Sequence, residues 1–137
     1  YNPYFGDRTD VVLWEVLNIE YGGKIKIEFL KNKTNYRQGI RTAVDVGEGD
    51  LEIFGVKSPE MELWEDTAPK EVICSCYANS GKISIYNIWD KRGYSESQRD
   101  SSGMILEEQG NKTIYHCNDC GFETANFDKF VFSIEKL

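Results

Sequence analysis

Four cysteines and a single histidine are the residues whose types and spacing could support chemistry in this chain. Cys117 and Cys120 are separated by two residues in YHCNDCGFET, and Cys74 and Cys76 by one residue in VICSCYA. Zinc takes four tetrahedral ligands, and two pairs of cysteines can supply them. The same four residues could instead form disulfide bonds, in any of three connectivities. The third alternative is that the thiols pack as small apolar side chains.

The two cysteine pairs do not suit zinc equally well. CNDCG has the spacing of a zinc knuckle, and Gly121 eases its turn. In an extended strand, Cys74 and Cys76 point the same way with Cα atoms roughly 6.5–7 Å apart. Sulfurs on one zinc ion lie only about 3.8 Å apart, so chelation by both would need a bulge or a bent strand. We therefore expect a buried stripe of Val72, both cysteines and Ala78, and keep zinc, bound by all four cysteines, as the alternative.

The histidine and the carboxylates give no clear catalytic arrangement. His116 and Cys117 are neighbours in a predicted strand, so they should face opposite sides of the sheet and not form a nucleophilic pair. Glu107 and Glu108 would need a pocket and a raised pKa to act as acid and base. The acidic GEGD at residues 47–50 has no following helix and does not resemble a phosphate-binding loop. We predict a non-enzyme without a cofactor; an enzyme that uses the Cys/His region is a further hypothesis.

The elements that must position these residues are predicted to be strands, because apolar and polar residues alternate with period two. Four pairs of such segments are separated by turn residues, which predicts successive hairpins. The turns are expected near residues 22–23, 47–50, 79–82 and 109–112. The final strand, DKFVFSIEKL, places Phe130, Phe132 and Ile134 on one face. The predicted fold class is all-β: a twisted antiparallel sheet, sandwich or partly open barrel built from these hairpins.

Two segments do not follow the hairpin pattern. SPEMELWEDT, residues 58–67, fits a short helix with Pro59 in its first turn, or a strand in which Met61 and Leu63 share a face. DKRGYSESQRDSS, residues 90–102, is polar and predicts a long mobile loop. Residues 1–137 fit one domain by length, and no apolar run is long enough to span a membrane.

The net charge of −7 is concentrated in one segment. Residues 45–71 contain nine acidic and two basic side chains, whereas the rest of the chain is balanced. Such a segment repels nucleic acid and anionic membranes and attracts basic partners. A solvated acidic face that serves only solubility is the simpler alternative.

Several stretches of the chain resemble small β-rich immunity proteins of bacterial polymorphic toxin systems. LWEVLNIEYGGKIKIEFL, residues 13–30, is similar to their opening hairpin. GKISIYNIWD, SSGMILEE and YHCNDCGFETANFDKFVFSIEKL resemble the C-terminal half of such proteins from Gram-positive bacteria, the immunity protein 50-like group and its relatives. The resemblance covers about half of the chain and is weakest over residues 31–70.

The resemblance implies a cytoplasmic protein that binds and blocks a cognate toxin and has no catalytic residues. An acidic inhibitor suits this role, because toxin domains that attack nucleic acid have basic surfaces. Trp64 is the predicted aromatic anchor, with a core position as its alternative. The predicted contact residues are Glu48, Asp50, Glu52, Glu60, Glu62, Trp64, Glu65 and Asp66. The alternative function is a zinc-stabilised β-sheet module that binds a protein or a small ligand.

Overall fold

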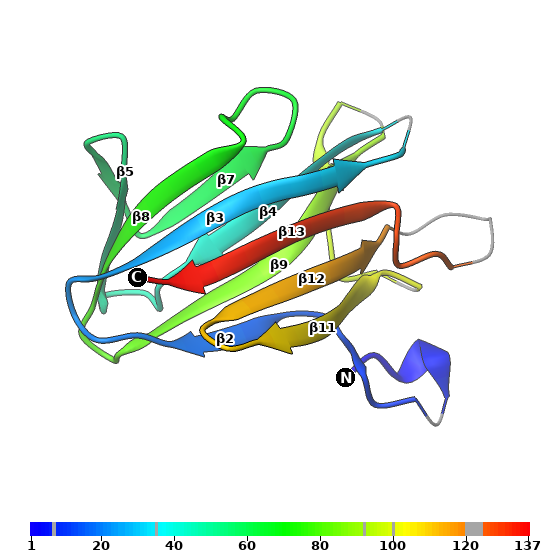
Figure 1. The fold of residues 1–137 in the computed structure, drawn as a ribbon, viewed down its shortest axis with the longest axis horizontal. Coiled ribbons are helices and arrows are strands. Elements are labelled where there is room, and N and C mark those ends of the chain that lie inside the picture. Colours follow the sequence, from blue (N-terminus) through cyan, green and yellow to red (C-terminus); the bar gives the residue numbers. More distant parts are fainter. Residues whose placement is uncertain (7, 35, 92, 100, 120–124) are drawn as a thin grey trace.

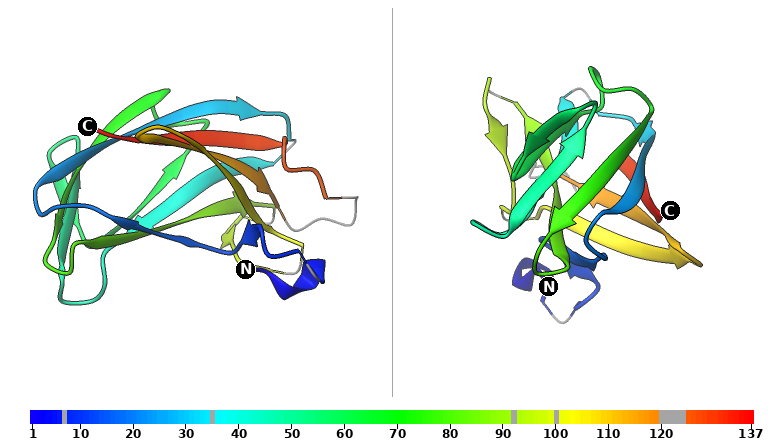
Figure 2. Two further views of the ribbon diagram at one scale, coloured as in Figure 1. Left: turned by 60° about the horizontal axis from the view of Figure 1, so that its bottom comes forward. Right: turned by 90° about the vertical axis from the view of Figure 1, so that its left-hand side faces the viewer.

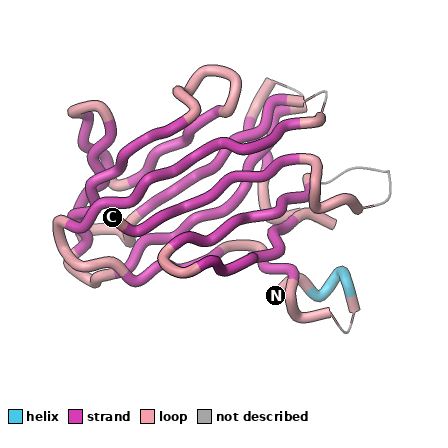
Figure 3. Tube along the Cα trace, in the orientation of Figure 1, coloured by secondary structure: helices cyan, strands magenta, loops and turns pink. Residues whose placement is uncertain are grey.

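The computed structural model of the chain consists almost entirely of β-strands (Figures 1 and 3). The structure describes residues 1–6, 8–34, 36–91, 93–99, 101–119 and 125–137. The only helical structure among these residues is one 3-10 turn, Pro3–Phe5. No described helix is therefore long and apolar enough to cross a membrane.

The described strands form two antiparallel sheets that face each other across a core (Figure 2). The larger sheet has the order β1 (Val11–Val12), β11 (Gly103–Gln109), β12 (Lys112–Asn118), β13 (Phe130–Lys136), β3 (Gly23–Asn32), β8 (Glu71–Ala78), β5 (Gly49–Ile53) and β6 (Val56–Ser58). The smaller sheet has the order β10 (Ser95–Glu96), β9 (Lys82–Asp90), β4 (Arg37–Ala43) and β7 (Glu60–Trp64), and β2 (Glu15–Asn18) also pairs with β9. The fold is therefore a twisted sandwich, as the sequence predicts.

The core between the sheets is built from the alternating apolar rows. These side chains are mostly β-branched or aromatic, which suits a pleated strand with one buried face. Each fully buried large side chain contributes roughly 1.5–3 kcal/mol to folding. The predicted rows are buried on β13 (Phe130, Phe132, Ile134), on β3 (Ile25, Ile27, Phe29) and on β8 (Val72, Cys74, Cys76, Ala78).

Three of the four predicted hairpins are wrong, although turns lie where the sequence places them. The turns that join β2 to β3, β4 to β5 and β8 to β9 each carry the chain from one sheet to the other. Of the four predicted pairs, only β11 and β12 pair with each other across their turn, with Glu108 opposite Thr113. Alternation shows that one face of a strand is buried, but both sheets bury a face on the same core. The partner strand is therefore not specified by the pattern.

The two ambiguous segments are resolved differently. Residues 60–64 form strand β7, so the strand alternative is correct, and Met61 and Leu63 pack against the core. In residues 90–102, Asp90 ends β9, Ser95–Glu96 form β10, and the other described residues form a loop; residues 92 and 100 lie outside the described residues. This loop folds back onto the sandwich, because Trp89 Nε1 donates to Glu96 at 2.9 Å and Asn118 Nδ2 donates to the Ser101 carbonyl at 2.8 Å.

The sandwich has two unlike ends. Tight turns that join strands of opposite sheets lie at the left in Figure 1. Strands β3, β9 and β12 end at the right, where the N-terminal segment also lies. We call this right-hand side the open end. It combines loops that are far apart in sequence.

Candidate functional site

The described cysteines lie in the hydrophobic core. Cys74, Cys76 and Cys117 have free thiols and are almost completely buried. Burial raises the pKa of Cys117 well above its ordinary value, so its thiol stays protonated and is a poor nucleophile or metal ligand. The predicted stripe on β8 is thereby confirmed as part of the core.

Sheet geometry keeps Cys117 away from the β8 pair. Cys117 lies opposite Phe130, which lies opposite Asn32, whereas Cys74 lies opposite Ile25 at the other end of β3. Three strand spacings of about 4.8 Å and seven residues of about 3.3 Å rise separate the two cysteines. One zinc ion or one disulfide cannot join them. Cys120 lies outside the described residues, within which no cluster of three or more His, Cys, Asp or Glu side chains could hold a metal ion.

His116 faces outward from β12, on the opposite side from Cys117 as predicted. Its Nε2 lies 3.1 Å from Glu107 Oε1, and its Nδ1 lies 3.5 Å from Asp128 Oδ1. The His116 contact, with a second hydrogen bond from Gln109, lowers the pKa of Glu107. These contacts fasten the segment before β13 to the outer face of the larger sheet. The residues that line the shallow hollow beside His116 include no hydroxyl or thiol nucleophile in the described part of the chain.

The acidic segment forms one side of the sandwich. It supplies the terminal strand of each sheet, β6 beside β5 in the larger sheet and β7 in the smaller one, and β5 contacts β7 (Figure 1). The predicted contact residues lie along these strands and the residues that adjoin them, and we call this set the acidic edge. Its members are Glu48, Asp50, Glu52, Glu60, Glu62, Trp64, Glu65 and Asp66.

Two arginines from outside the segment neutralise part of the acidic edge. Arg41 on β4 pairs with Glu60 and, at 3.4 Å, with Glu62. Arg37 binds Asp66 through Nε and Nη2 at 2.9–3.1 Å. Neither arginine was predicted from the sequence, because both precede the acidic segment along the chain and join it only through the pairing of β4 with β7.

The remaining carboxylates of the acidic edge are less neutralised. Among the described residues, Glu52 has a single distant ion-pair partner, Lys57 Nζ at 3.8 Å. Glu48, Asp50 and Glu65 form no salt bridge with any described residue. Two of these three lie at the beginning of β5, so the strongest negative field is expected there and not on β7.

Trp64 is a half-buried residue and not a bare anchor. The Arg37 guanidinium carbon lies 4.6 Å from the centre of its ring, which is the geometry of a cation–π contact. The ring also covers Gly39, where an added side-chain carbon would lie 3.0 Å from Trp64 and 2.5 Å from the Leu63 carbonyl oxygen. Any larger residue at position 39 would therefore displace Trp64 and the edge strand.

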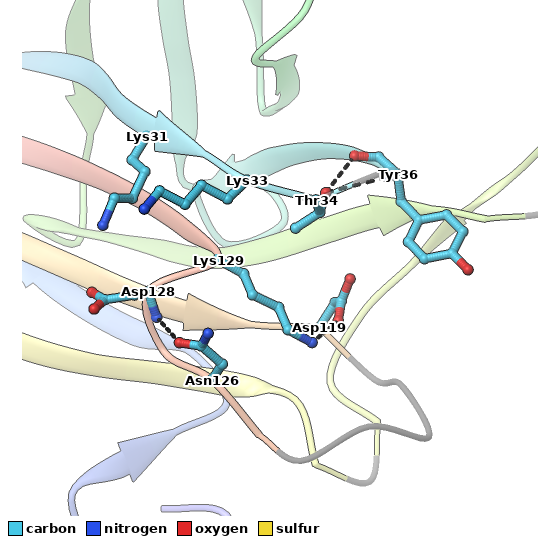
Figure 4. A pocket seen from close by; sticks show the side chains of 8 residues that line it. All are labelled: Lys31, Lys33, Thr34, Tyr36, Asp119, Asn126, Asp128 and Lys129. Atoms are coloured by element: carbon cyan, nitrogen blue, oxygen red, sulfur yellow. Dashed lines mark hydrogen bonds and ion pairs between the residues drawn. The ribbon is translucent and has the colours of Figure 1, made fainter.

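A second site, at the open end, was not found from the sequence. It is a polar pocket of about 690 Å³ between the β3–β4 connection and the segment that precedes β13 (Figure 4). We call it the open-end pocket. Its lining residues are Lys31, Lys33, Thr34, Tyr36, Asp119, Asn126, Asp128 and Lys129. No motif marks it, because the two halves are more than eighty residues apart and meet only through the pairing of β3 with β13.

Comparisons with known proteins add no assignment to either site. No protein-family model matches the chain. Neither the curated proteins nor the solved structures contain a significant match. The resemblance to immunity proteins stays a prediction.

Proposed function

We propose that this protein is an inhibitor of the immunity-protein kind, which binds a basic toxin through the acidic edge and blocks it by occlusion. The observation that carries the proposal is the position of the acidic segment. Strand β5, next to the edge strand of the larger sheet, and β7, the edge strand of the smaller sheet, are in contact on one side of the molecule, and both carry carboxylates that face away from the core. A single partner that covers this side of the molecule can contact both groups of carboxylates.

The arrangement of charges supports a binding role over a catalytic one. Arg37 pairs with Asp66 and Arg41 with Glu60, while the carboxylates at the start of β5 form no salt bridge with a described residue. A negative patch of this kind raises the association rate of a basic partner more than it raises affinity. Occlusion needs no nucleophile, metal or cofactor.

The test is the association rate with the toxin encoded beside this protein's gene, measured for Glu48→Gln with Asp50→Asn. We expect association to slow by about threefold or more at low salt and by less at high salt, because screening removes the steering. The matched control is Glu20→Gln with Glu108→Gln, which removes two other exposed carboxylates without a salt bridge among the described residues.

Equal rates for the test and control variants at both salt concentrations would overturn the proposed surface. Absence of any binding to that toxin, with the wild-type protein folded, would overturn the proposed function itself.

A further inference from the structure

The tip of the β5–β6 hairpin carries a bulky residue in a backbone conformation that disfavours it. β5 ends at Ile53 and β6 begins at Val56, and these two residues lie opposite each other across a two-residue turn. Both turn residues have a positive φ, 53° at Phe54 and 78° at Gly55. Positive φ at both positions is the mark of a type I′ turn, which favours asparagine, aspartate or glycine at the first position. An aromatic residue is strained there.

The Phe54 side chain is not buried in return for this strain. It is 69% exposed, and Val56 beyond the turn is 62% exposed. Ser75 on β8 lies opposite Glu52, so Ile73, two residues earlier and 44% exposed, points to the same side of the sheet as Glu52. Continued by two residues, this register brings Ile73 level with Phe54. Exposed apolar residues therefore lie together at the hairpin tip, beyond β8 at the side of the sandwich (Figure 1).

Folding does not account for a phenylalanine at this position. A positive φ costs free energy for any bulky residue, and an exposed ring leaves apolar surface in water. Gln98, the other described non-glycine residue with a positive φ, is polar and avoids the second cost. Strained residues are characteristic of functional sites, where the surrounding structure holds them in place. The two costs at Phe54 are therefore explained by a contact that forms only with a partner.

Carboxylates border this apolar tip. The members of the acidic edge on and just before β5 are Glu48, Asp50 and Glu52. They precede Phe54 at intervals of two residues, which is about 6.6 Å along an extended strand. Lys57 is the one basic residue of the hairpin, and its Nζ lies 3.8 Å from Glu52. A second copy of this chain or an anionic membrane would be repelled here, whereas a basic protein surface would be attracted.

We propose that Phe54 is the aromatic anchor of the acidic edge and enters an apolar pocket, bordered by basic side chains, on the toxin. The inference rests on the proposed function and extends it to the residue that sets affinity. The carboxylates steer the approach, and the ring, once buried, slows dissociation. A tight hairpin presents the ring in a fixed position, so little entropy is lost on binding. Trp64, the anchor predicted from the sequence, is instead in contact with Arg37.

The experiment compares the stability and the toxin binding of Phe54→Asn in the full chain, with the toxin encoded beside this protein's gene. Asparagine tolerates a positive φ, so the melting temperature should not fall, and we expect it to rise by about 2–4 °C. The complex with the toxin should dissociate at least tenfold faster, because the anchor is lost. A residue that served folding would lower stability when replaced.

Tyr94→Asn is the matched control. It removes another exposed aromatic side chain, 56% accessible, from the connection between β9 and β10. Because this connection lies outside the acidic edge, the dissociation rate should stay within twofold of the wild-type rate.

Three results would overturn the anchor: dissociation of Phe54→Asn less than tenfold faster than wild type, a comparable acceleration in Tyr94→Asn, or a fall in the melting temperature of Phe54→Asn. Failure of Phe54→Asn to fold would likewise assign Phe54 to the fold. Each of these results leaves the proposed function intact if the wild-type protein binds the toxin and Glu48→Gln with Asp50→Asn slows association. Absence of wild-type binding would instead overturn the proposed function, and the anchor with it.

Discussion

Carboxylates occupy two contrasting environments in this molecule. On the acidic edge they are at least partly exposed on or beside β5 and β7, and they either pair with Arg37, Arg41 or Lys57 or form no salt bridge with a described residue. Elsewhere, Asp119 is enclosed between Gln38 and Lys129, and Glu15 is partly buried and accepts a hydrogen bond from Tyr115. The carboxylates of the acidic edge are solvated and need no partner, whereas Glu15 and Asp119 depend on the groups that bind them.

The contrast follows from solvation. Exposed ion pairs contribute little to stability, because water and salt screen them and long side chains must be immobilised. A buried charge requires its partner, because the partner replaces the lost hydration. Carboxylates on the acidic edge can therefore serve recognition, whereas the buried carboxylates contribute to folding through their partners.

The largest expected effect concerns Lys129. Lys129→Met leaves Asp119 buried without its cation, and we expect the free energy of unfolding to fall by about 3 kcal/mol. Denaturant unfolding of the full chain measures this change. The double variant with Asp119→Asn should regain most of the loss, because it removes the stranded charge. A loss of less than about 0.5 kcal/mol would show that Asp119 is not an enclosed charge and would remove the contrast with the acidic edge.

A smaller effect is expected at Tyr115. Its hydroxyl donates to Glu15 across the core, and Tyr115→Phe removes that donor while the ring keeps its stacking on Phe132. We expect a loss of about 1–2 kcal/mol at neutral pH. The same substitution in a Glu15→Gln background should be less harmful, because no charge is then left without a donor. Equal losses in both backgrounds would contradict the proposed coupling.

The pH dependence of Glu15 sharpens the same contrast. Burial raises the pKa of Glu15 above its ordinary 4.5, so the folded protein holds this proton more tightly than the unfolded chain does. Its contribution to stability is therefore full at low pH and is lost as the pH rises through and above 4.5. The stability of Glu15→Gln relative to wild type should increase between about pH 4 and pH 7. A constant difference over this range would show that Glu15 is solvated like the edge carboxylates.

On the acidic edge, substitutions should change association and not stability. Arg37→Gln with Arg41→Gln uncovers the carboxylates of β7, so we expect a faster association with the basic toxin and little change in the unfolding midpoint. The control is Arg8→Gln, which breaks another exposed arginine–carboxylate pair. A large drop in the midpoint for the edge variant alone would show that these pairs serve folding.

The smallest effect is expected from a chelator or a reductant. The described thiols are buried in the core, and packing holds the fold, so the melting temperature should not change with either additive. Thermal melts with and without each additive provide the measurement. A fall of tens of degrees with the chelator would assign a structural metal and displace the core as the main source of stability.

The sequence predicted the strands better than their partners. Alternation located the buried faces of β3, β8 and β13, and the turn residues located the chain reversals, because both signals are local. The hairpin prediction was wrong for β2 with β3, β4 with β5 and β8 with β9, because a tight turn can lead to the opposite sheet as readily as to the same one.

The candidate sites divide in the same way. Composition alone located the acidic segment, since its charge lies within 27 consecutive residues. Composition did not show that Arg37 and Arg41 pair with carboxylates on and after β7. It also did not show that Glu48 and Asp50 form no salt bridge with a described residue. The open-end pocket left no signal in the sequence, because neither of its halves is distinctive alone.

By itself, then, the sequence determined the class of structure, the buried face of each long strand and the concentration of charge, all of which depend on neighbours along the chain. The tertiary structure decided which strands pair, which carboxylates are compensated and where Asp119 meets Gln38 and Lys129. These features depend on residues that are distant in sequence. Burial of the apolar faces brings these distant residues into contact. Local sequence patterns do not encode which distant strand packs against a given face.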